Sequence, residues 1–136
     1  MSYRDILEAH LRDEEGDEPL PYKDSRGNWT IGVGHVMTKP IPEDVRALLL
    51  EFDMDDAEND ARALFSTFNT LSDNRKAAVT DLAFNMGRDT LSEFHHFIAA
   101  VSREDWATAV NELKNSLWWG EVGQRGPRIA QQLMEG

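Results

Sequence analysis

The sequence of 136 residues contains no cysteine, which excludes a disulfide framework and a metal site with thiolate ligands. It also has no apolar stretch long enough to span a bilayer, so no stable membrane insertion is expected. Basic residues are few, with 14 Lys and Arg against 25 Asp and Glu, and the formal net charge is -11. Nucleic-acid binding needs basic patches, so nucleic acid is not an expected partner.

The N-terminal segment lacks a basic region followed by an apolar run, so no classical secretory signal is expected. Hydrophobic residues make up 40% of the chain and include 6 Phe and 4 Trp, enough to fill a core. A chain of this length predicts one compact domain over residues 1–136. No apolar surface stripe is left over after the core is assigned, which predicts a monomer.

Acid, turn and strand signals are concentrated in the stretch from Glu15 to His35. Leu7, Leu11 and Glu15 recur at helical spacing, so Glu15 continues the apolar stripe of a first helix. A carboxyl group at the end of such a stripe is expected to be partly desolvated, which favours its neutral, proton-donating form. Gly16 directly follows and predicts the end of that helix.

The segment after this helix predicts a hairpin. Asp24 to Gly27 has the composition of a turn, and Asp24 alone is explained equally well as a turn-stabilising residue. Thr30 lies in a short strand and alone is an ordinary β-former. Gly32 and Gly34 either bend this strand or allow another group to approach the backbone closely.

This spacing resembles that of the phage lysozymes of the T4 type, glycoside hydrolase family 24. The family pattern stands here as Glu15-Gly16, Tyr22-Lys23-Asp24 and Gly27-Asn28-Trp29-Thr30-Ile31-Gly32-Val33-Gly34-His35. The resemblance continues more thinly through Phe84-Asn85-Met86-Gly87, Trp106, Ser116-Leu117-Trp118, Arg125 and Arg128. It implies an α+β, lysozyme-like fold with a small sheet lobe, a helical lobe and a cleft between them.

The resemblance also implies a muramidase that hydrolyses the β-1,4 bond between N-acetylmuramic acid and N-acetylglucosamine in peptidoglycan, with inversion. Glu15 would be the general acid, Asp24 would stabilise the developing positive charge and help to activate the attacking water, and Thr30 would hold that water. No cofactor or metal is required. The substrate-binding residues that it implies are Gly34, Asn85 and Met86.

Three further residues are expected near the site for structural reasons. His35 has no second histidine at metal-binding spacing, so an ion pair with an acid of the long helix is favoured. The family alignment indicates Asp53 as its partner, whereas the helical phase leaves Asp56 as a competitor. Arg125 matches a family arginine near the catalytic acid, where its charge favours the ionised form and burial favours the neutral form.

The predicted organisation is a sheet lobe over about 12–40, a connecting segment over 43–68, and a helical lobe over 70–136 that includes the first helix. Segment 43–68 is either one helix with an acidic middle or two helices with a break. Further helices are expected from the Thr70–Asp73 cap to Met86, from Ser92, from the Ser102–Asp105 cap and from Pro127. His95 and His96 are expected near the surface and Trp118 in the core, whereas the sequence does not decide whether Trp119 is buried.

Two other functions remain open. A lytic transglycosylase cuts the same bond without water, but it manages with one catalytic Glu and does not need Asp24. An inactive wall-binding domain is disfavoured because Glu15, Asp24 and Thr30 are all present. The protein is strongly negative and bacterial envelopes are also anionic, so any attraction to the wall is expected to be local. A product without a signal would reach the periplasm through a holin or by delivery in a virion.

Overall fold

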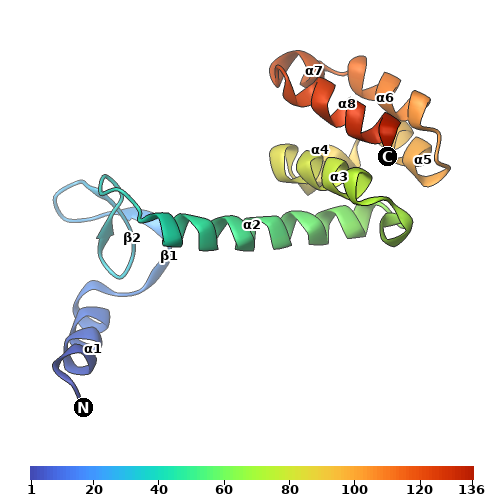
Figure 1. Cartoon of the computed structure of the whole chain (residues 1–136). Helices are drawn as coiled ribbons and strands as arrows, with labels where there is room; N and C mark the ends of the chain where they lie inside the picture. The colour runs from blue at the N-terminus through green and yellow to red at the C-terminus, as the bar shows by residue number, and fades with distance from the viewer. The chain divides into compact units, whose positions relative to one another are not determined.

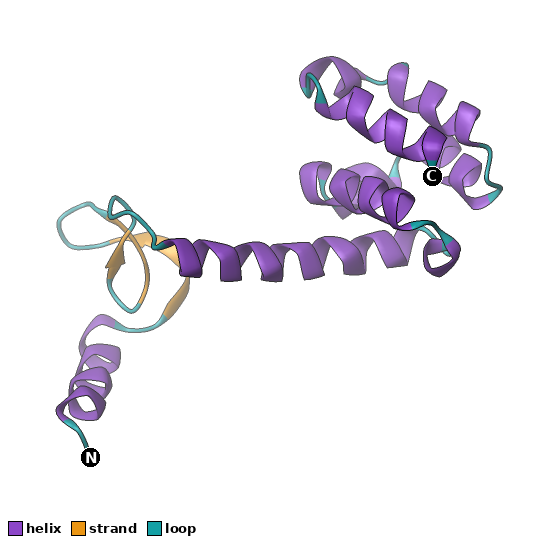
Figure 2. Cartoon of the chain, viewed as in Figure 1, coloured by secondary structure: helices purple, strands orange, loops and turns teal.

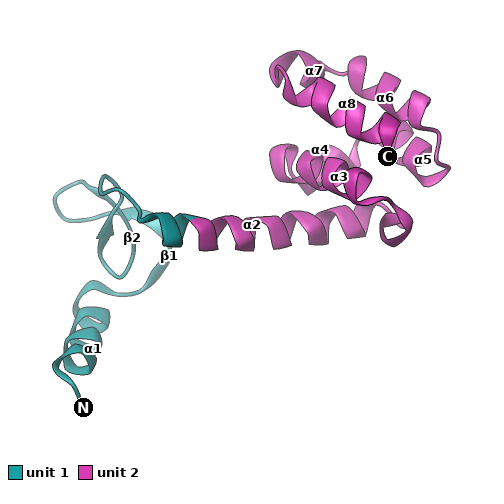
Figure 3. Ribbon diagram, viewed as in Figure 1, with its two compact units in different colours: residues 1–46 teal, residues 47–136 magenta.

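The computed structural model describes residues 1–136 and divides into two compact units, residues 1–46 and 47–136 (Figure 3). Helices dominate, and all of the strands lie in the first unit (Figure 2). The predicted α+β class is therefore confirmed. The elements shown in Figure 1 are α1 Tyr3–Glu15, β1 Glu18–Lys23, β2 Trp29–Gly32, β3 His35–Val36, α2 Glu43–Leu64, α3 Asp73–Met86, α4 Arg88–Ser92, α5 His95–Ser102, α6 Trp106–Lys114, α7 Leu117–Glu121 and α8 Arg125–Glu135, with a 3-10 turn at Phe68–Thr70.

Helix α1 begins and ends where the sequence predicts. Ser2 and Asp5 form a reciprocal capping box, in which each side chain accepts the backbone N–H of the other residue at 2.8 and 3.3 Å. At the other end, Gly16 has φ 77° and its N–H donates to the carbonyl of Arg12 at 3.1 Å. Glu15 is therefore the last residue of the helix, at the point where the chain turns into β1.

The three strands form an antiparallel sheet in the order β1-β2-β3. Tyr22 pairs with Thr30, and Glu18 pairs with Gly32, with a register shift between these two pairs. Two prolines lie within the shifted part of β1, where they cannot donate to the ladder. The β2–β3 pairing places Ile31 opposite His35.

Segment 43–64 is a single helix, which answers the question that its sequence leaves open. Helix α2 begins directly after Pro42 and continues without a break through the acidic middle. Its buried residues, Ala57 and Ala61, both lie in its second half. No helix of the protein combines the length and the apolar character needed to cross a membrane.

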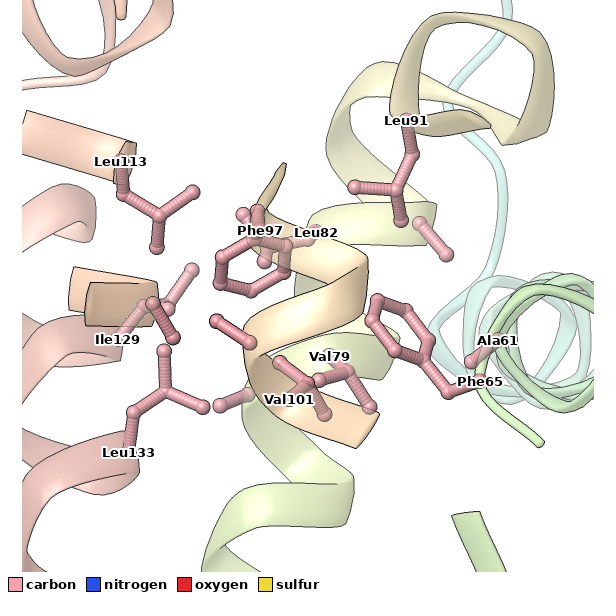
Figure 4. Packing of buried hydrophobic residues seen from close by; sticks show 14 of the residues in the cluster. Ala61, Phe65, Val79, Leu82, Leu91, Phe97, Val101, Leu113, Ile129 and Leu133 are labelled. Carbon is pink, nitrogen blue, oxygen red and sulfur yellow. The ribbon is translucent and has the colours of Figure 1, made fainter. Parts of the chain in front are cut away.

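The second unit is built around a single hydrophobic cluster. Ala78, Val79, Leu82 and Ala83 of α3 are buried, as the periodicity of this segment predicts. Figure 4 shows α3 side chains packed among those of α5, α6 and α8. The largest fully buried side chains are those of Phe97, Leu82, Leu91, Leu113, Ile129, Leu133, Val79 and Val101.

Arg75 lies on the same stripe of α3 and links three helices. Its guanidinium carbon lies 4.0 Å from the ring centroid of Trp106 in α6. Its Nε donates to the carbonyl of Leu133 in α8 at 2.9 Å. A charged residue thus occupies an apolar stripe because its stem packs while its head stacks on an aromatic ring and pairs with a helix C-terminus.

Three boundaries in the second unit differ from the predictions. Ser92 does not open a helix: it ends α4, and its hydroxyl donates back to the carbonyl of Asp89 at 2.6 Å. The turn-rich segment before the last helix contains the short helix α7, and α8 begins at Arg125, two residues before Pro127.

The histidine and tryptophan predictions hold. His95 and His96 are exposed and Trp118 is buried, as expected. Trp119, which the sequence left open, packs against the core with its ring on Gly126, where an added Cβ would lie 2.9 Å from Cε3.

Candidate active site

The side chain of Glu15 lies against the backbone of Gly34. A Cβ added at Gly34 would lie 3.1 Å from both Cγ and Oε2 of Glu15. Gly34 has φ 65°, so it combines a left-handed turn with a close approach that only glycine permits. Gly32 and Gly34 also flank the turn between β2 and β3. Both roles that the sequence suggests for these glycines, a bend in the strand and a close approach to the backbone, are therefore present. The expected partial desolvation of Glu15 is not found within this unit, because α1 has no buried residue.

Asp24 occupies the hairpin turn between β1 and β2 and satisfies its backbone. Oδ1 accepts the N–H groups of Arg26 at 2.9 Å and of Asn28 at 2.8 Å. The bond from Asn28 is the main reason that the pKa of Asp24 lies below its usual value; burial opposes it with a smaller effect, and the bond from Arg26 adds a further lowering. Backbone donors favour the ionised carboxylate, so Asp24 is held as an anion.

Thr30 is tied to the same residue of the turn. It is buried, with 2% of its surface exposed, and its hydroxyl donates to the carbonyl of Asn28 at 3.0 Å. That carbonyl also accepts the N–H of Asp24 at 2.9 Å. Because the donor of the Thr30 hydroxyl is used, its oxygen lone pairs remain to accept a hydrogen bond from water. The peptide groups of Asn28 thus connect two of the three predicted catalytic residues.

His35 begins β3 directly after Gly34. Its Nε2 is buried and has no hydrogen-bond partner. A buried ring nitrogen without a hydrogen-bond partner is energetically unfavourable. The predicted ion pair between His35 and Asp53 joins residues of different units and stays a prediction. No group of three or more His, Asp or Glu side chains is arranged to hold a metal ion.

Asn85 and Met86, at the end of α3, line a pocket of about 630 Å³ in the second unit. The pocket is mainly apolar, with Phe94 and Leu117 in its walls, and Leu117 is 88% exposed. The Oδ1 of Asn85 accepts the indole N–H of Trp118 at 2.8 Å. The amide of Asn85 is therefore fixed in orientation, with its NH2 group remaining as a donor.

Arg125 forms an ion pair within the second unit. Its Nε lies 3.1 Å from Oδ1 of Asp81, and both side chains are partly exposed. Asp81 precedes Asn85 by one turn on the same face of α3. The positive charge of Arg125 thus has a carboxylate partner close to the pocket that Asn85 lines.

Sequence reasoning missed Asn28 and Asp81. Asn28 acts through its peptide groups, which no residue pattern reveals. Asp81 could have been found from its helical spacing to Asn85, although its partner lies far away in the sequence.

A family model described as phage lysozyme matches residues 12–132. The chain belongs to the phage lysozyme family. The resemblance drawn from the motif is thereby confirmed, and with it the lysozyme-like α+β fold and a lysozyme-type glycoside hydrolase activity.

Several curated proteins are similar to this chain at modest sequence identity. Probable T4-type lysozyme 2 of Dictyostelium discoideum is 28% identical over an alignment that covers 90% of each chain. Probable T4-type lysozyme 1 of the same organism is 27% identical over 93% of this chain and 92% of its own. The pre-baseplate central spike protein Gp5 of Enterobacteria phage T4 is 23% identical over 93% of this chain but only 27% of its own.

The pKa of Asp24 can be tested directly. We expect carbon-detected NMR titration to give a value below the usual range, because the N–H groups of Asn28 and Arg26 stabilise the anion. A lowered folded pKa contributes stability above the unfolded pKa, and this contribution is lost as pH falls through the folded pKa. Wild type and Asp24→Asn should therefore differ most in thermal unfolding near neutral pH and converge in acid.

Asp13→Asn is the matched control, because Asp13 is exposed and accepts no hydrogen bond from the protein. Near neutral pH, Asp13→Asn should change the melting temperature less than Asp24→Asn does. An Asp24 that titrates at or above the usual value would contradict the role given to the hairpin N–H groups.

Proposed function

We propose that this protein is a muramidase that hydrolyses the β-1,4 bond between N-acetylmuramic acid and N-acetylglucosamine in peptidoglycan. The proposal rests on the arrangement in residues 1–46, where Glu15 lies on Gly34 and an anionic Asp24 shares Asn28 with Thr30. Glycoside hydrolysis requires two carboxyl groups, one that donates a proton and one that is ionised. The relatives named as probable T4-type lysozymes support the same reaction.

In this mechanism Glu15 donates its proton to the leaving glycosidic oxygen. Asp24, held as an anion by its backbone donors, stabilises the positive charge on the sugar ring and helps to activate the water on the opposite face. The lone pairs of the Thr30 hydroxyl orient that water. We assign an inverting outcome, for which the two carboxyl groups should lie about 6.5–9.5 Å apart.

Asn85 and Met86 are assigned to substrate binding. The pocket that they line is large enough for a sugar ring, and its apolar walls suit the apolar face of a saccharide. The fixed amide of Asn85 offers an NH2 donor to a carbonyl or hydroxyl oxygen. Gly34 contributes by leaving room for the Glu15 side chain, and Arg125 stays near the site in its ion pair with Asp81. Action as a monomer on the cell wall, after holin release or virion delivery, completes the proposal.

The decisive experiment is the release of saccharides from purified peptidoglycan, followed by mass spectrometry of their ends. Wild type should release reducing ends, and Glu15→Gln should reduce the rate by about two to four orders of magnitude because the amide cannot donate the proton. Glu14→Gln, one residue away on the exposed surface, is the matched control and should keep the wild-type rate.

Other results would indicate a different function or a wrong assignment of the acid. Anhydro ends would identify a lytic transglycosylase, and no release would identify a wall-binding domain. A slow Glu14→Gln with a fast Glu15→Gln would show that the wrong carboxylate is assigned. The anomer released first distinguishes the stereochemical outcomes, since a β product seen by proton NMR would contradict inversion.

The contact between Glu15 and Gly34 makes a second prediction. Gly34→Ala and Gly32→Ala both place alanine at φ 65° and share the same backbone strain, but only Gly34→Ala meets Glu15. We expect similar losses in thermal stability, whereas activity should fall about a hundredfold in Gly34→Ala alone because Glu15 is displaced. Equal activities in the two variants would exclude a positioning effect of this contact.

The ion pair of His35 with Asp53 stays a proposal that the family resemblance implies. An ion pair between them predicts that His35→Asn and Asp53→Asn each lower the melting temperature near pH 5.5. The double variant should cost less than the sum of the two, by about 0.5–3 kcal/mol. If Asp56→Asn is destabilising and Asp53→Asn is not, then Asp56 is the partner.

A further inference from the structure

One face of the sheet in the first unit carries a row of three exposed side chains. Lys23 of β1 pairs with Trp29 of β2, in the part of the ladder beyond the register shift. The carbonyl of Trp29 accepts the N–H of Met37 at 2.9 Å, so Met37 continues this row directly after β3. Because side chains alternate between the two faces of a strand, the row points away from Thr30, which occupies the other face. Lys23, Trp29 and Met37 together form the Trp29 face.

The apolar part of the Trp29 face is open to solvent. Trp29 is 52% exposed and Met37 is 48% exposed, whereas Thr30 on the opposite face is only 2% exposed. All of these residues belong to residues 1–46, so the face is formed within the first unit alone. Neighbouring exposed apolar side chains that are bordered by charged groups are typical of a binding surface.

The charge beside this apolar area is positive. Nζ of Lys23 lies 5.3 Å from the centroid of the Trp29 ring, where the aromatic face attracts the cation. Neither Lys23 nor Arg26, which is exposed in the adjoining turn, forms a salt bridge within the protein. Segment 19–41 contains one acid, Asp24, and three basic residues, Lys23, Arg26 and Lys39. The hairpin is thus locally basic in a protein with a net charge of -11.

These features define the class of ligand. An exposed indole binds the apolar face of a ring, and two cations without a salt-bridge partner favour a ligand that carries carboxylates. The row crosses the sheet as a strip about 10 Å wide at the usual strand spacing, which suits an extended polymer. A nucleic acid, with a phosphate on every nucleotide, would be repelled by the net negative charge of the protein. A glycan with carboxylate substituents meets all of these conditions.

We propose that the Trp29 face binds a peptidoglycan strand whose stem peptides carry carboxylates. A sugar ring of the strand packs on Trp29 and Met37, and a peptide carboxylate pairs with Lys23 or Arg26. The choice of peptidoglycan rests on the proposed function, whereas the need for an acidic saccharide comes from the face itself. Such a surface supplies the local attraction to an anionic wall that the net charge of the protein opposes.

The test is an NMR titration of the full-length Glu15→Gln protein, which removes turnover, with two soluble probes. Muropeptides are disaccharides that carry peptide carboxylates, whereas chitotetraose consists of N-acetylglucosamine without any carboxylate. Both should cause saturable shifts of the Trp29 indole N–H and the Met37 amide, and muropeptides should bind more tightly. Trp29→Ala, followed at Met37, should weaken the binding of both probes about tenfold. Lys23→Gln, a surface change, should weaken muropeptide binding alone, by about two- to fivefold.

Tyr3→Ala and Arg4→Gln are the matched controls, because they remove an exposed aromatic and an exposed basic side chain of the same unit outside the Trp29 face. Both should bind the two probes as the parent protein does. The proposal is overturned if neither probe shifts Trp29, if Lys23→Gln binds muropeptides normally, or if it weakens chitotetraose binding equally.

Vesicles of anionic phospholipid are titrated in parallel. Shifts of Trp29 with vesicles and none with muropeptides would identify a membrane-binding surface and would also overturn the proposal. Reducing-end release is measured separately on the wild type. A wild type that releases reducing ends while the Trp29 face binds nothing leaves the muramidase proposal standing, and binding without release leaves the Trp29 face standing.

Discussion

The candidate site of the first unit depends on the peptide groups of one residue, Asn28. Its N–H is held by the carboxylate of Asp24, and its carbonyl accepts both the backbone N–H of Asp24 and the hydroxyl of Thr30. The charge that stabilises the turn is thus the charge proposed to act on the sugar. The carboxylate of Asp24 therefore stabilises the hairpin and also carries the proposed chemical role. Its negative charge is compensated by the backbone N–H groups that it accepts.

Much of the fold follows from local signals in the sequence. The capping box of Ser2 and Asp5 and the glycine after Glu15 define the first helix, because each acts within a few residues of the helix end. Ser92 shows where such reasoning fails. A serine favours both helix starts and helix ends, and here its hydroxyl bonds back to Asp89 within a short helix. The neighbouring Leu91 is buried in the core, and this packing is not evident from the sequence.

The candidate site is predictable to a similar degree. The spacing of Glu15, Asp24 and Thr30 could be recognised because the three residues lie within one continuous stretch. The pairing of Arg125 with Asp81 could not, since it joins α3 to α8, which are far apart in the sequence. The contact of Glu15 with Gly34 lies between these cases: two glycines suggested a close approach, but the sequence did not name the group that approaches.

Gly34 also has a stereochemical consequence. The two hydrogens on its Cα are not equivalent, because only the one that an L-residue would replace by Cβ points at Glu15. The positive φ disfavours L-residues and suits their mirror images. A D-alanine introduced here by chemical synthesis would direct its methyl away from the carboxylate and adopt this φ without strain. The constraint on this position is therefore one of handedness as well as size, and none of the genetically encoded side chains can meet both requirements.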